Sequence, residues 1–340
     1  MLYRLARPLL FCLDAESAHG AGLKLLGALH AMGVSRLLAS AAPRLPVRAM
    51  GIDFPNPLGL AAGMDKNGDH IDALFDLGFG FIEVGAVTPR PQSGNPRPRI
   101  FRLTEAQAII NRMGFNNLGV DHLVANLQRR KSIGIVGVNI GKNFDTPIER
   151  ASKDYVHCLK KVYPHASFVT ANVSSPNTSG LRNLQQDELL DNLLGELAHA
   201  RDELVRASGR RVPIAVKIAP DLDDAVIDAL AGRVIAHGMD AVIATNTTLS
   251  RAGIEHLPAS REAGGLSGRP LRERSTEVIA RLARALSGRV PVIGVGGISN
   301  AADAAEKLGA GATLLQLYSA LVFEGPGLVG KIVTGLAQSR

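Results

Sequence analysis

Short apolar runs alternate with helix-length amphipathic stretches from residue 57 to the end of the chain. This alternation constrains the fold most, because continuous apolar runs are typical of parallel strands that helices cover on the outside. Eight strand–helix repeats close a barrel, whereas six repeats with an early G-x-G-x-x-G motif would indicate an open dinucleotide-binding sheet. The sequence therefore predicts a (β/α)8 TIM barrel with the strands Leu58–Ala61, Phe81–Val84, Ile135–Asn139, Phe168–Asn172, Ile214–Lys217, Ala241–Ala244, Val292–Val295 and Thr313–Gln316.

Two connections of this predicted barrel are too long to be simple helices. Residues 85–134 contain four prolines and a hairpin pattern between residues 99 and 110, and residues 245–275 contain four glycines. Long structured loops after barrel strands usually build or cover the active site. We therefore expect both connections at the catalytic end of the barrel.

Residues 1–45 are predicted to form an N-terminal extension, and residues 46–340 the barrel domain. Leucines at positions 2, 5, 9 and 13 recur at helical spacing, and a second apolar stripe follows the break at residues 14–17, where a new helix can be capped. Residues 1–48 hold six lysines and arginines against two acidic residues, so they supply +4 of the net charge of +7. This pattern predicts two short amphipathic helices, which either cap the barrel or insert their apolar side into a membrane surface.

Several classes of protein are disfavoured by the composition. Charged residues interrupt the N-terminal apolar runs, so we expect no membrane-spanning segment, and no A-x-A cleavage site follows, so we expect no secretion. Cys12 and Cys158 fit no metal or disulfide pattern and are expected to be reduced thiols. Aromatic residues make up 4% of the chain, without tryptophan, which argues against a nucleic-acid partner that stacks on the protein.

Polar residues gather where the predicted strands end, which is where barrel enzymes carry out their chemistry. They include neither the His/Cys/carboxylate cluster of a catalytic zinc site nor the paired carboxylates of a glycosidase, so no metal is expected. Carboxamides both donate and accept hydrogen bonds, so a ring of them suits a flat heterocycle or a ligand with amide groups. The strand-end residues are Lys66, Asn67, Asn139, Asn172, Lys217, Thr245, Asn246, Thr247, Thr248, Gln316, Tyr318 and Ser319.

Two features after the last strands indicate a phosphate site. The glycines of residues 294–297 let the backbone approach a ligand after the seventh strand, and a short helix is expected to begin near residues 316–319. Loops after strands seven and eight form the usual phosphate site of a barrel. The alternative is a tight turn without a ligand.

Lys217 and the segment 172–182 each have more than one interpretation. Lys217 is expected to be buried at the end of the fifth strand, where it would form a Schiff base, stabilise negative charge on a reduced flavin, or belong to a structural ion pair. Residues 172–182 are rich in Asn, Ser, Pro and Gly, which suit either an ordinary turn or a polar binding loop. The residues alone leave these alternatives open.

Six motifs together resemble the dihydroorotate dehydrogenase family, and the similarity extends over nearly the whole chain. The combination is highly specific for that family, which has a barrel fold and binds FMN. The motifs are Ala61 through Asn67, Asn111 through Asn117, Asn172 through Asn177, Ala244 through Thr248, Gly264 through Gly268 and Gly294 through Ile298.

The resemblance also implies a class within the family. The catalytic base is a serine in the membrane-associated class that reduces quinone and a cysteine in the soluble class, and the matching residue here is Ser175. The basic helical N-terminus resembles the extension that admits quinone in the first class. The resemblance therefore implies oxidation of dihydroorotate to orotate, ubiquinone as acceptor and a peripheral position on the cytoplasmic face of the cell membrane.

The family's roles carry over to this chain by motif. Ser175 is expected to take a proton from the substrate, with Thr178 as a candidate relay for that proton. Relatives often have a threonine where this chain has Ala86, so only main-chain contact with FMN is expected there. Substrate is expected at Lys66, Asn111, Arg112, Met113, Gly114, Phe115, Asn172, Asn177, Asn246 and Thr247, and FMN at Ala62, Gly63, Met64, Asp65, Lys66, Ala86, Asn139, Asn172, Lys217, Thr245, Gly268, Gly297, Tyr318 and Ser319.

Three rival functions remain for a chain with this sequence. A Schiff-base lyase would use Lys217 and no flavin, and a flavin barrel acting on RNA would exploit the basic charge, although that charge is concentrated at the N-terminus. A membrane-tethered ligand carrier would bind without turnover. A flavin absorption spectrum argues against the first, and turnover of dihydroorotate with a quinone against the third.

Overall fold

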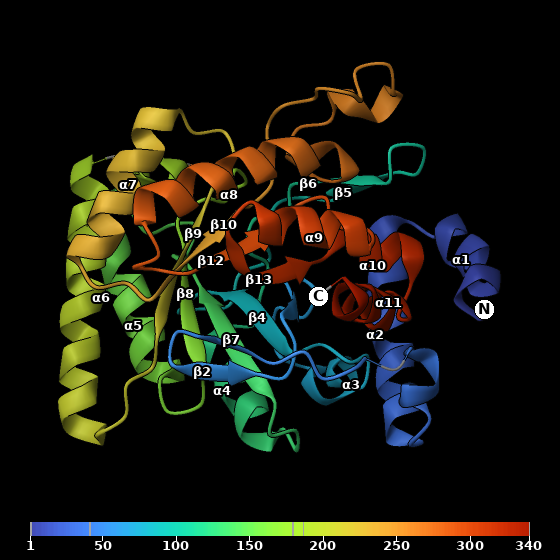
Figure 1. Ribbon diagram of the computed structural model, residues 1–340, viewed down its shortest axis with the longest axis horizontal. Helices are drawn as coiled ribbons and strands as arrows, with labels where there is room; N and C mark the ends of the chain where they lie inside the picture. Colours follow the sequence, from blue (N-terminus) through green and yellow to red (C-terminus); the bar gives the residue numbers. More distant parts are fainter. Residues whose placement is uncertain (1, 41, 179, 186, 340) are drawn as a thin grey trace.

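Eight parallel strands close into a barrel in the computed structural model, which describes residues 2–40, 42–178, 180–185 and 187–339 (Figure 1). Each strand pairs with its neighbours in chain order, and the last strand pairs with the first. All eight predicted apolar runs are strands of this barrel, so the predicted fold class is confirmed. The strands are β3 (Leu58–Leu60), β4 (Phe81–Val87), β7 (Ile135–Ile140), β8 (Phe168–Asn172), β9 (Ile214–Ile218), β10 (Ala241–Ala244), β12 (Val292–Val295) and β13 (Ala312–Leu317).

Helices follow the strands and cover the outside of the barrel. They are amphipathic: in the helix after β7, for example, Tyr155, Leu159 and Val162 recur at helical spacing and are fully buried. This one-sided burial explains why the strands they cover are apolar on both faces. The helices are α3 (Ile71–Phe75), α4 (Val120–Arg129), α5 (Ala151–Val162), α6 (Asp187–Ser208), α7 (Asp224–Ala236), α8 (Arg272–Leu286), α9 (Ala301–Gly309), α10 (Ser319–Glu324) and α11 (Leu328–Gln338).

A hairpin of β1 (Val47–Ala49) and β2 (Ile52–Phe54) closes the amino-terminal end of the barrel. Phe54 packs edge-on against Phe81, with ring centres 5.2 Å apart, and Phe81 packs against Phe168 at 6.1 Å. The rings need glycines on the facing strands, because a Cβ at residue 59 would lie 2.3 Å from the Phe81 ring. Apolar rings thus fill this end, and a ligand has to enter at the other one.

The two long connections meet in a small antiparallel sheet beside the open end. The predicted hairpin forms β5 (Ile100–Leu103) and β6 (Ala108–Asn111), and β11 (Gly265–Gly268) from the second connection pairs with β6. The hairpin is confirmed, whereas the third strand was not predicted. This sheet brings Asn111 opposite Gly265.

The N-terminal extension consists of α1 (Leu2–Cys12), α2 (Ala15–Ala31) and a short 3-10 turn (Ser35–Leu38). The predicted cap is present, because the Asp14 carboxylate accepts hydrogen bonds from the backbone N–H groups of Glu16 and Ser17. Figure 1 shows both helices (blue) at one end of the barrel, with α1 beside α10. Within the described residues, no helix is long and apolar enough to cross a bilayer.

Polar contacts fix the extension to the barrel. The Glu16 carboxylate pairs with Arg97 at 2.9 Å and Arg99 at 2.7 Å, and the Asp76 carboxylate after α3 pairs with His30 at 2.6 Å. The Arg102 guanidinium of β5 donates to backbone carbonyls at the end of α1, including that of Phe11 at 3.1 Å. The extension is therefore packed against the barrel, as the prediction of a cap requires. The alternative prediction, insertion into a membrane surface, concerns the outer surface of these helices.

Candidate active site

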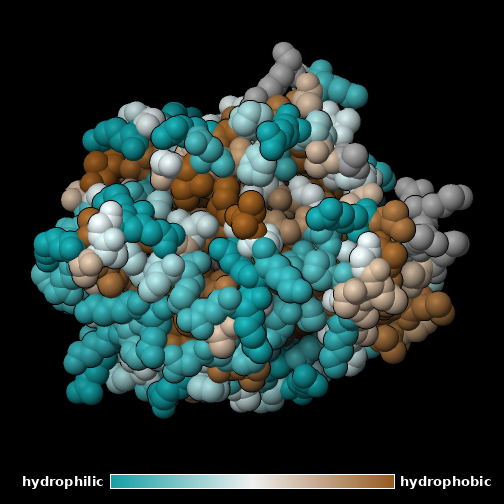
Figure 2. Space-filling view, turned by 90° about the horizontal axis from the view of Figure 1, so that it is seen from below, coloured by the Kyte–Doolittle hydropathy of each residue, from teal (hydrophilic) through white to brown (hydrophobic). Residues whose placement is uncertain are grey.

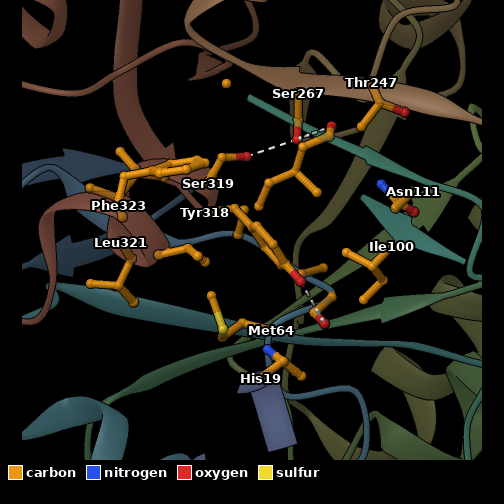
Figure 3. A pocket seen from close by; sticks show the side chains of 18 of the residues that line it. His19, Met64, Ile100, Asn111, Thr247, Ser267, Tyr318, Ser319, Leu321 and Phe323 are labelled. Carbon is orange, nitrogen blue, oxygen red and sulfur yellow. Dashed lines mark hydrogen bonds between the residues drawn. The ribbon is translucent and has the colours of Figure 1, made fainter. Parts of the chain in front are cut away.

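A cavity of about 570 Å³ runs from the carboxyl ends of the barrel strands to the space between α1, α2 and α10. Its inner part is lined by residues that follow the strands, and its outer part by apolar residues of the three helices. Figure 3 shows Tyr318 in the middle of the cavity, with Leu321 and Phe323 of α10 on one side and Asn111 and Thr247 on the other. The cavity thus joins the barrel mouth to the N-terminal extension.

Carboxamides from neighbouring strands form a hydrogen-bonded chain at the inner end. Asn139 Nδ2 donates to Glu83 Oε1 at 2.6 Å, and Asn172 Nδ2 donates to Asn139 Oδ1 at 3.1 Å. Asn246 Nδ2 then lies 3.4 Å from Asn172 Oδ1 and donates to the Ser174 hydroxyl at 3.0 Å. The predicted asparagines therefore lie together as a hydrogen-bonded chain, and the chain begins at a carboxylate that the sequence did not single out.

Two lysines line the same end of the cavity. Neither Lys66 nor Lys217 forms a hydrogen bond or ion pair with another residue in the described part of the chain. Burial, with the nearby charge of Arg99, lowers the pKa of Lys66 to about 8. Burial also lowers the pKa of Lys217, and the Glu83 carboxylate opposes that shift. Cations without protein partners at the inner end of a cavity favour an anionic ligand beside them.

The loop after β8 places Ser175 in the wall of the cavity, where only 5% of the residue is exposed. The Ser175 hydroxyl accepts a weak hydrogen bond from the Asn177 backbone N–H at 3.3 Å, and the Asn177 side chain donates to Asn111 Oδ1 at 3.3 Å. The Thr178 hydroxyl is buried and has no partner among the described residues. A direct Thr178–Ser175 hydrogen bond is therefore not formed, and the proton relay stays a prediction.

Glycines keep the far wall open where the strands β11 and β12 end. Gly268 has φ +97°, and a Cβ there would lie 2.3 Å from the Gln107 carbonyl oxygen; at Gly297, with φ +72°, it would lie 2.5 Å from the Arg272 Cα. The Ser319 hydroxyl donates to the Ser267 hydroxyl at 2.8 Å beside them (Figure 3). Only glycine permits this close backbone packing, which leaves main-chain groups accessible from the cavity.

Buried side chains behind this wall hold the glycine loop in place. The Asp303 carboxylate accepts from the Ser299 backbone N–H at 2.9 Å and from Arg272 at 3.0 Å. The Ser275 hydroxyl donates to the Gly296 carbonyl at 3.0 Å and accepts from the Lys307 ammonium at 2.7 Å. The predicted phosphate loop is therefore supported from behind by a complete polar network.

The outer part of the cavity holds several titratable side chains among apolar ones, namely Tyr3, His19, Arg102, Tyr318 and Glu324. Burial raises the pKa of Tyr318 to about 12, and its hydroxyl points toward the Gly63 carbonyl oxygen at 3.5 Å. Burial, followed by the charge of Lys66, lowers the pKa of His19 to about 4, so its imidazole is neutral near pH 7. This end is therefore a largely apolar surface that carries the neutral His19 and Tyr318 beside Tyr3, Arg102 and Glu324.

The inner residues suit FMN as a bound group. Lys217 supplies a buried cation, Gly268 and Gly297 supply backbone that lines the cavity, and Gln316 Oε1 is a buried acceptor without a partner in the described part of the chain. An FMN molecule has the complementary parts, namely a phosphate, a ring that becomes negatively charged on reduction, and ring N–H and carbonyl groups. The donor set therefore fits the cofactor.

The structure brings most of the predicted site residues together and leaves three outside the lining of the cavity. The Asp65 carboxylate faces away and accepts from the backbone N–H groups of Asp69 and His70, the Arg112 guanidinium pairs with Glu262 at 2.6 Å, and Asn139 lies beneath the lining. The predicted residues that line the cavity are Ala62, Gly63, Met64, Lys66, Ala86, Asn111, Met113, Gly114, Phe115, Asn172, Ser175, Asn177, Lys217, Thr245, Asn246, Thr247, Gly268, Gly297, Tyr318 and Ser319.

Sequence reasoning missed Glu83 and His19. Glu83 has a recognisable signal, because it is an acidic residue inside the otherwise apolar run of β4. His19 has none, because only the packing of α2 against the barrel brings it to the cavity. Among the described residues, no group of three or more histidines, cysteines and carboxylates is arranged to hold a metal ion.

Comparisons with known proteins identify the family of this chain. The sequence model of the family Dihydroorotate dehydrogenase matches residues 44–339. A protein named dihydroorotate dehydrogenase (quinone) from Azotobacter vinelandii is 58% identical over 339 residues, which cover 100% of this chain and 98% of that protein. One of the same name from Flavobacterium lutescens is 57% identical, with 100% and 97% covered.

A solved structure extends the agreement to three dimensions. The crystal structure of DHODH from Eimeria tenella in complex with ferulenol superimposes with a TM-score of 0.87 and 36% sequence identity. The match covers 96% of this chain and 91% of that one, so it extends well beyond the eight strands of the barrel. The chain therefore belongs to the dihydroorotate dehydrogenase family, in its quinone-dependent class.

Proposed function

We propose how the cavity serves the two half-reactions of this enzyme, which oxidises dihydroorotate to orotate in pyrimidine biosynthesis with FMN as cofactor and a quinone as electron acceptor. The observation that carries the proposal is the continuity of the cavity. Its inner end holds Ser175, Lys66 and the carboxamides, and its outer end opens between α1 and α2. Dihydroorotate binds at the inner end and ubiquinone at the outer end.

Ser175 is the base of the first half-reaction. Its hydroxyl is buried and lies at the cavity wall beside Asn177 and Asn111, which hold the amide groups of the substrate ring together with Asn172, Asn246 and Thr247. Lys66 pairs with the substrate carboxylate, and the backbone of residues 112–115 completes the pocket. A positioned base contributes about 10²–10⁴-fold to such a step. We assign the relay of this proton to Thr178, and its support is that the Thr178 hydroxyl is buried without a partner in the described part of the chain.

FMN supplies hydride acceptance from the substrate and electron release to the quinone when it is bound. The chain's own residues determine where each reactant lies. Lys217, Gly268 and Gly297 hold the cofactor between the two ends of the cavity, together with main-chain groups near residues 62, 63 and 86. Tyr318 and Ser319 separate this region from the outer part of the cavity between α1, α2 and α10, which we call the outer chamber.

The outer chamber gives ubiquinone a route from a lipid surface. Large apolar side chains of the extension are exposed to solvent, among them Leu9 at 75%, Met32 at 64% and Leu37 at 79%. Figure 2 shows apolar side chains (brown) at the end of the molecule that carries the extension, besides others over the middle of the same face. Exposed apolar side chains with basic residues nearby are typical of helices that lie in a membrane surface. The enzyme is therefore a peripheral protein, on the cytoplasmic face of the cell membrane.

A two-step spectroscopic experiment tests the division of the cavity. Dihydroorotate is expected to bleach the flavin absorption of the anaerobic purified protein, and a short-chain ubiquinone is expected to restore it. Deletion of residues 1–46 is expected to leave FMN bound and bleaching intact while slowing the recovery and abolishing liposome binding. Equal loss of bleaching and recovery in a variant that retains FMN would contradict the assignment of the outer chamber to the quinone.

A further inference from the structure

Glu83 and Lys217 are the only charged residues in the eight barrel strands, and both face the barrel interior. Side chains alternate along a strand, so Glu83 lies on the same face of β4 as Phe81, one layer closer to the cavity. Glu83 is 0% exposed and Lys217 5% exposed. A buried carboxylate is costly unless it is hydrogen-bonded and balanced by a cation, so its presence here calls for a function.

Two carboxamides donate to the Glu83 carboxylate from opposite sides. Asn139 Nδ2 donates to Oε1 at 2.6 Å, and Gln316 Nε2 donates to Oε2. An ionised carboxylate only accepts hydrogen bonds, so it forces the nitrogen of each carboxamide toward itself and the oxygen of each away from itself. Gln316 Oε1 is consequently left as a buried acceptor, without a partner among the described residues, in the cavity lining.

The orientation forced on Asn139 determines the next two residues. Its Oδ1 accepts from Asn172 Nδ2 at 3.1 Å, which leaves Asn172 Oδ1 to accept from Asn246 Nδ2 and from the Ser174 backbone N–H at 3.3 Å. Each carboxamide could otherwise point either way. One carboxylate therefore determines which atoms of Asn172 and Asn246 remain for a ligand.

Glu83 also acts on Lys217 through its charge. Lys217 has no hydrogen bond or ion pair in the described part of the chain, and the nearby Glu83 carboxylate favours its protonated form. Removing the carboxylate would leave the cationic side of this pair uncompensated beside the cofactor. A more positive environment favours the reduced, more negative form of a flavin.

We propose that Glu83 is a positioning residue that fixes the donor and acceptor orientation of the carboxamide chain and, through Lys217, sets the reduction potential of the bound FMN. This inference rests on the proposed placement of FMN and substrate in the cavity. It differs from that proposal in its readouts, because FMN content and flavin bleaching by dihydroorotate test the placement, whereas the potential and the affinity for orotate test Glu83.

The variant Glu83→Gln keeps the shape of the side chain and removes the charge. We expect at least a tenfold change in the ratio of the FMN dissociation constants of the oxidised and reduced forms, in favour of the reduced form. For a two-electron couple this corresponds to a rise of about 30 mV in the midpoint potential. We also expect the dissociation constant of orotate, measured by flavin absorbance, to rise by about tenfold because Asn139 loses its fixed orientation.

A double variant, Glu83→Gln with Gln316→Glu, exchanges the carboxylate and the carboxamide between β4 and β13. The new glutamine can donate to the new carboxylate and accept from Asn139, so both the charge and the orientation of the chain are restored. We expect two quantities to return to within about threefold of their native values. They are the ratio of the FMN dissociation constants of the oxidised and reduced forms, and the dissociation constant of orotate. The control Asp228→Asn removes one carboxylate that pairs with Arg281 on the outer surface and is expected to change neither quantity.

Either of two results would overturn the proposal. One is a Glu83→Gln protein that binds FMN and differs from native only in thermal stability, with the ratio of its FMN dissociation constants and its orotate affinity both within twofold of native. The other is a double variant with the same shift as the single one. If Glu83→Gln does not fold, Glu83→Asp replaces it. This variant keeps the charge, so the ratio of the FMN dissociation constants should stay within about threefold of native, while orotate affinity should fall by about tenfold because the shorter side chain no longer orients Asn139. A changed ratio with native orotate affinity would also refute the proposal.

Discussion

At its inner end the cavity is bordered by two lysines and by carboxamides and hydroxyls, several of which are joined in a hydrogen-bonded network, whereas its outer end is bordered mainly by leucines, alanines and phenylalanines of α1, α2 and α10. The inner carboxamides are held by defined hydrogen bonds, and the outer helices leave large apolar side chains exposed. Directional contacts discriminate between similar polar ligands, while an apolar chamber accepts a hydrophobic molecule with less regard to its details. Substitutions at the two ends should therefore affect different steps.

The largest expected effect is on the rate of one half-reaction alone, the reduction of the flavin at the inner end of the cavity. Ser175→Ala removes the proposed base, so flavin reduction by dihydroorotate should slow by about 10²–10⁴-fold, while flavin reoxidation by quinone should stay within about twofold of native. Stopped-flow measurement of the two half-reactions checks this. Equal slowing of both would refute the role of Ser175 as base.

A change on the outer surface should affect only the encounter with the membrane. Leu9→Glu combined with Leu37→Glu places charges at two side chains that are 75% and 79% exposed. Partition onto anionic phospholipid vesicles should fall by about 10²-fold, because each leucine no longer enters the apolar layer. Flavin reduction by dihydroorotate should be unchanged.

The matched control for this variant is Ile133→Glu, because Ile133 is fully exposed between α4 and β7, far along the chain from the extension. It should leave vesicle binding as it is in the native protein. Equal losses of vesicle binding in both variants would show that general hydrophobicity, rather than the extension, governs the association.

The pH dependence of orotate binding should report on the inner end. The pKa of Lys66 is lowered to about 8, so its ammonium is present below that pH and is lost as the pH rises through it. The dissociation constant of orotate should therefore be about tenfold higher at pH 9 than at pH 7. Titration of the flavin spectrum with orotate measures it, and in Lys66→Met the same pH step should have little effect. A pH dependence that persists in this variant would assign the titration to another group.

The smallest expected effect tests an unpartnered hydroxyl. Thr247 Oγ1 is buried without a partner among the described residues, and its neighbour Gly265 leaves no room for a Cβ, which would lie 1.9 Å from it. Thr247→Val keeps the shape and removes the hydroxyl, so orotate should bind about fivefold more weakly. The Michaelis constant for quinone should not change, and a larger effect on quinone than on orotate would place Thr247 at the wrong end of the cavity.

The barrel was predictable from the sequence because each strand is a local apolar run and each helix a local amphipathic one. The Asp14 cap and the hairpin of β5 and β6 are local patterns as well. The pairing of β11 with β6 was not predictable, because it joins residues about 150 positions apart through backbone atoms that any sequence possesses. The plug formed by β1 and β2 was missed because two strands of three residues are too short to show a period.

The site was predictable to the extent that it follows strand ends. Asn139, Asn172 and Lys217 could be placed at one mouth because parallel strands align their carboxyl ends. The direction of the Asp65 side chain was not predictable, because it depends on two backbone N–H groups in the turn that follows. The outer chamber was outside the reach of strand arguments, because it exists only where α2 lies against the barrel.

The aromatic floor of the barrel has a consequence for how this chain can vary. The Phe81 ring occupies the space that a side chain at residue 59 would need, and the Phe168 ring does the same at residue 137, where a Cβ would lie 2.1 Å from it. In each pair, the phenylalanine ring on one strand therefore fills the space that the glycine on the adjacent strand leaves free. Homologues that enlarge residue 59 or 137 should carry a smaller residue at 81 or 168, so these two pairs should covary across the family.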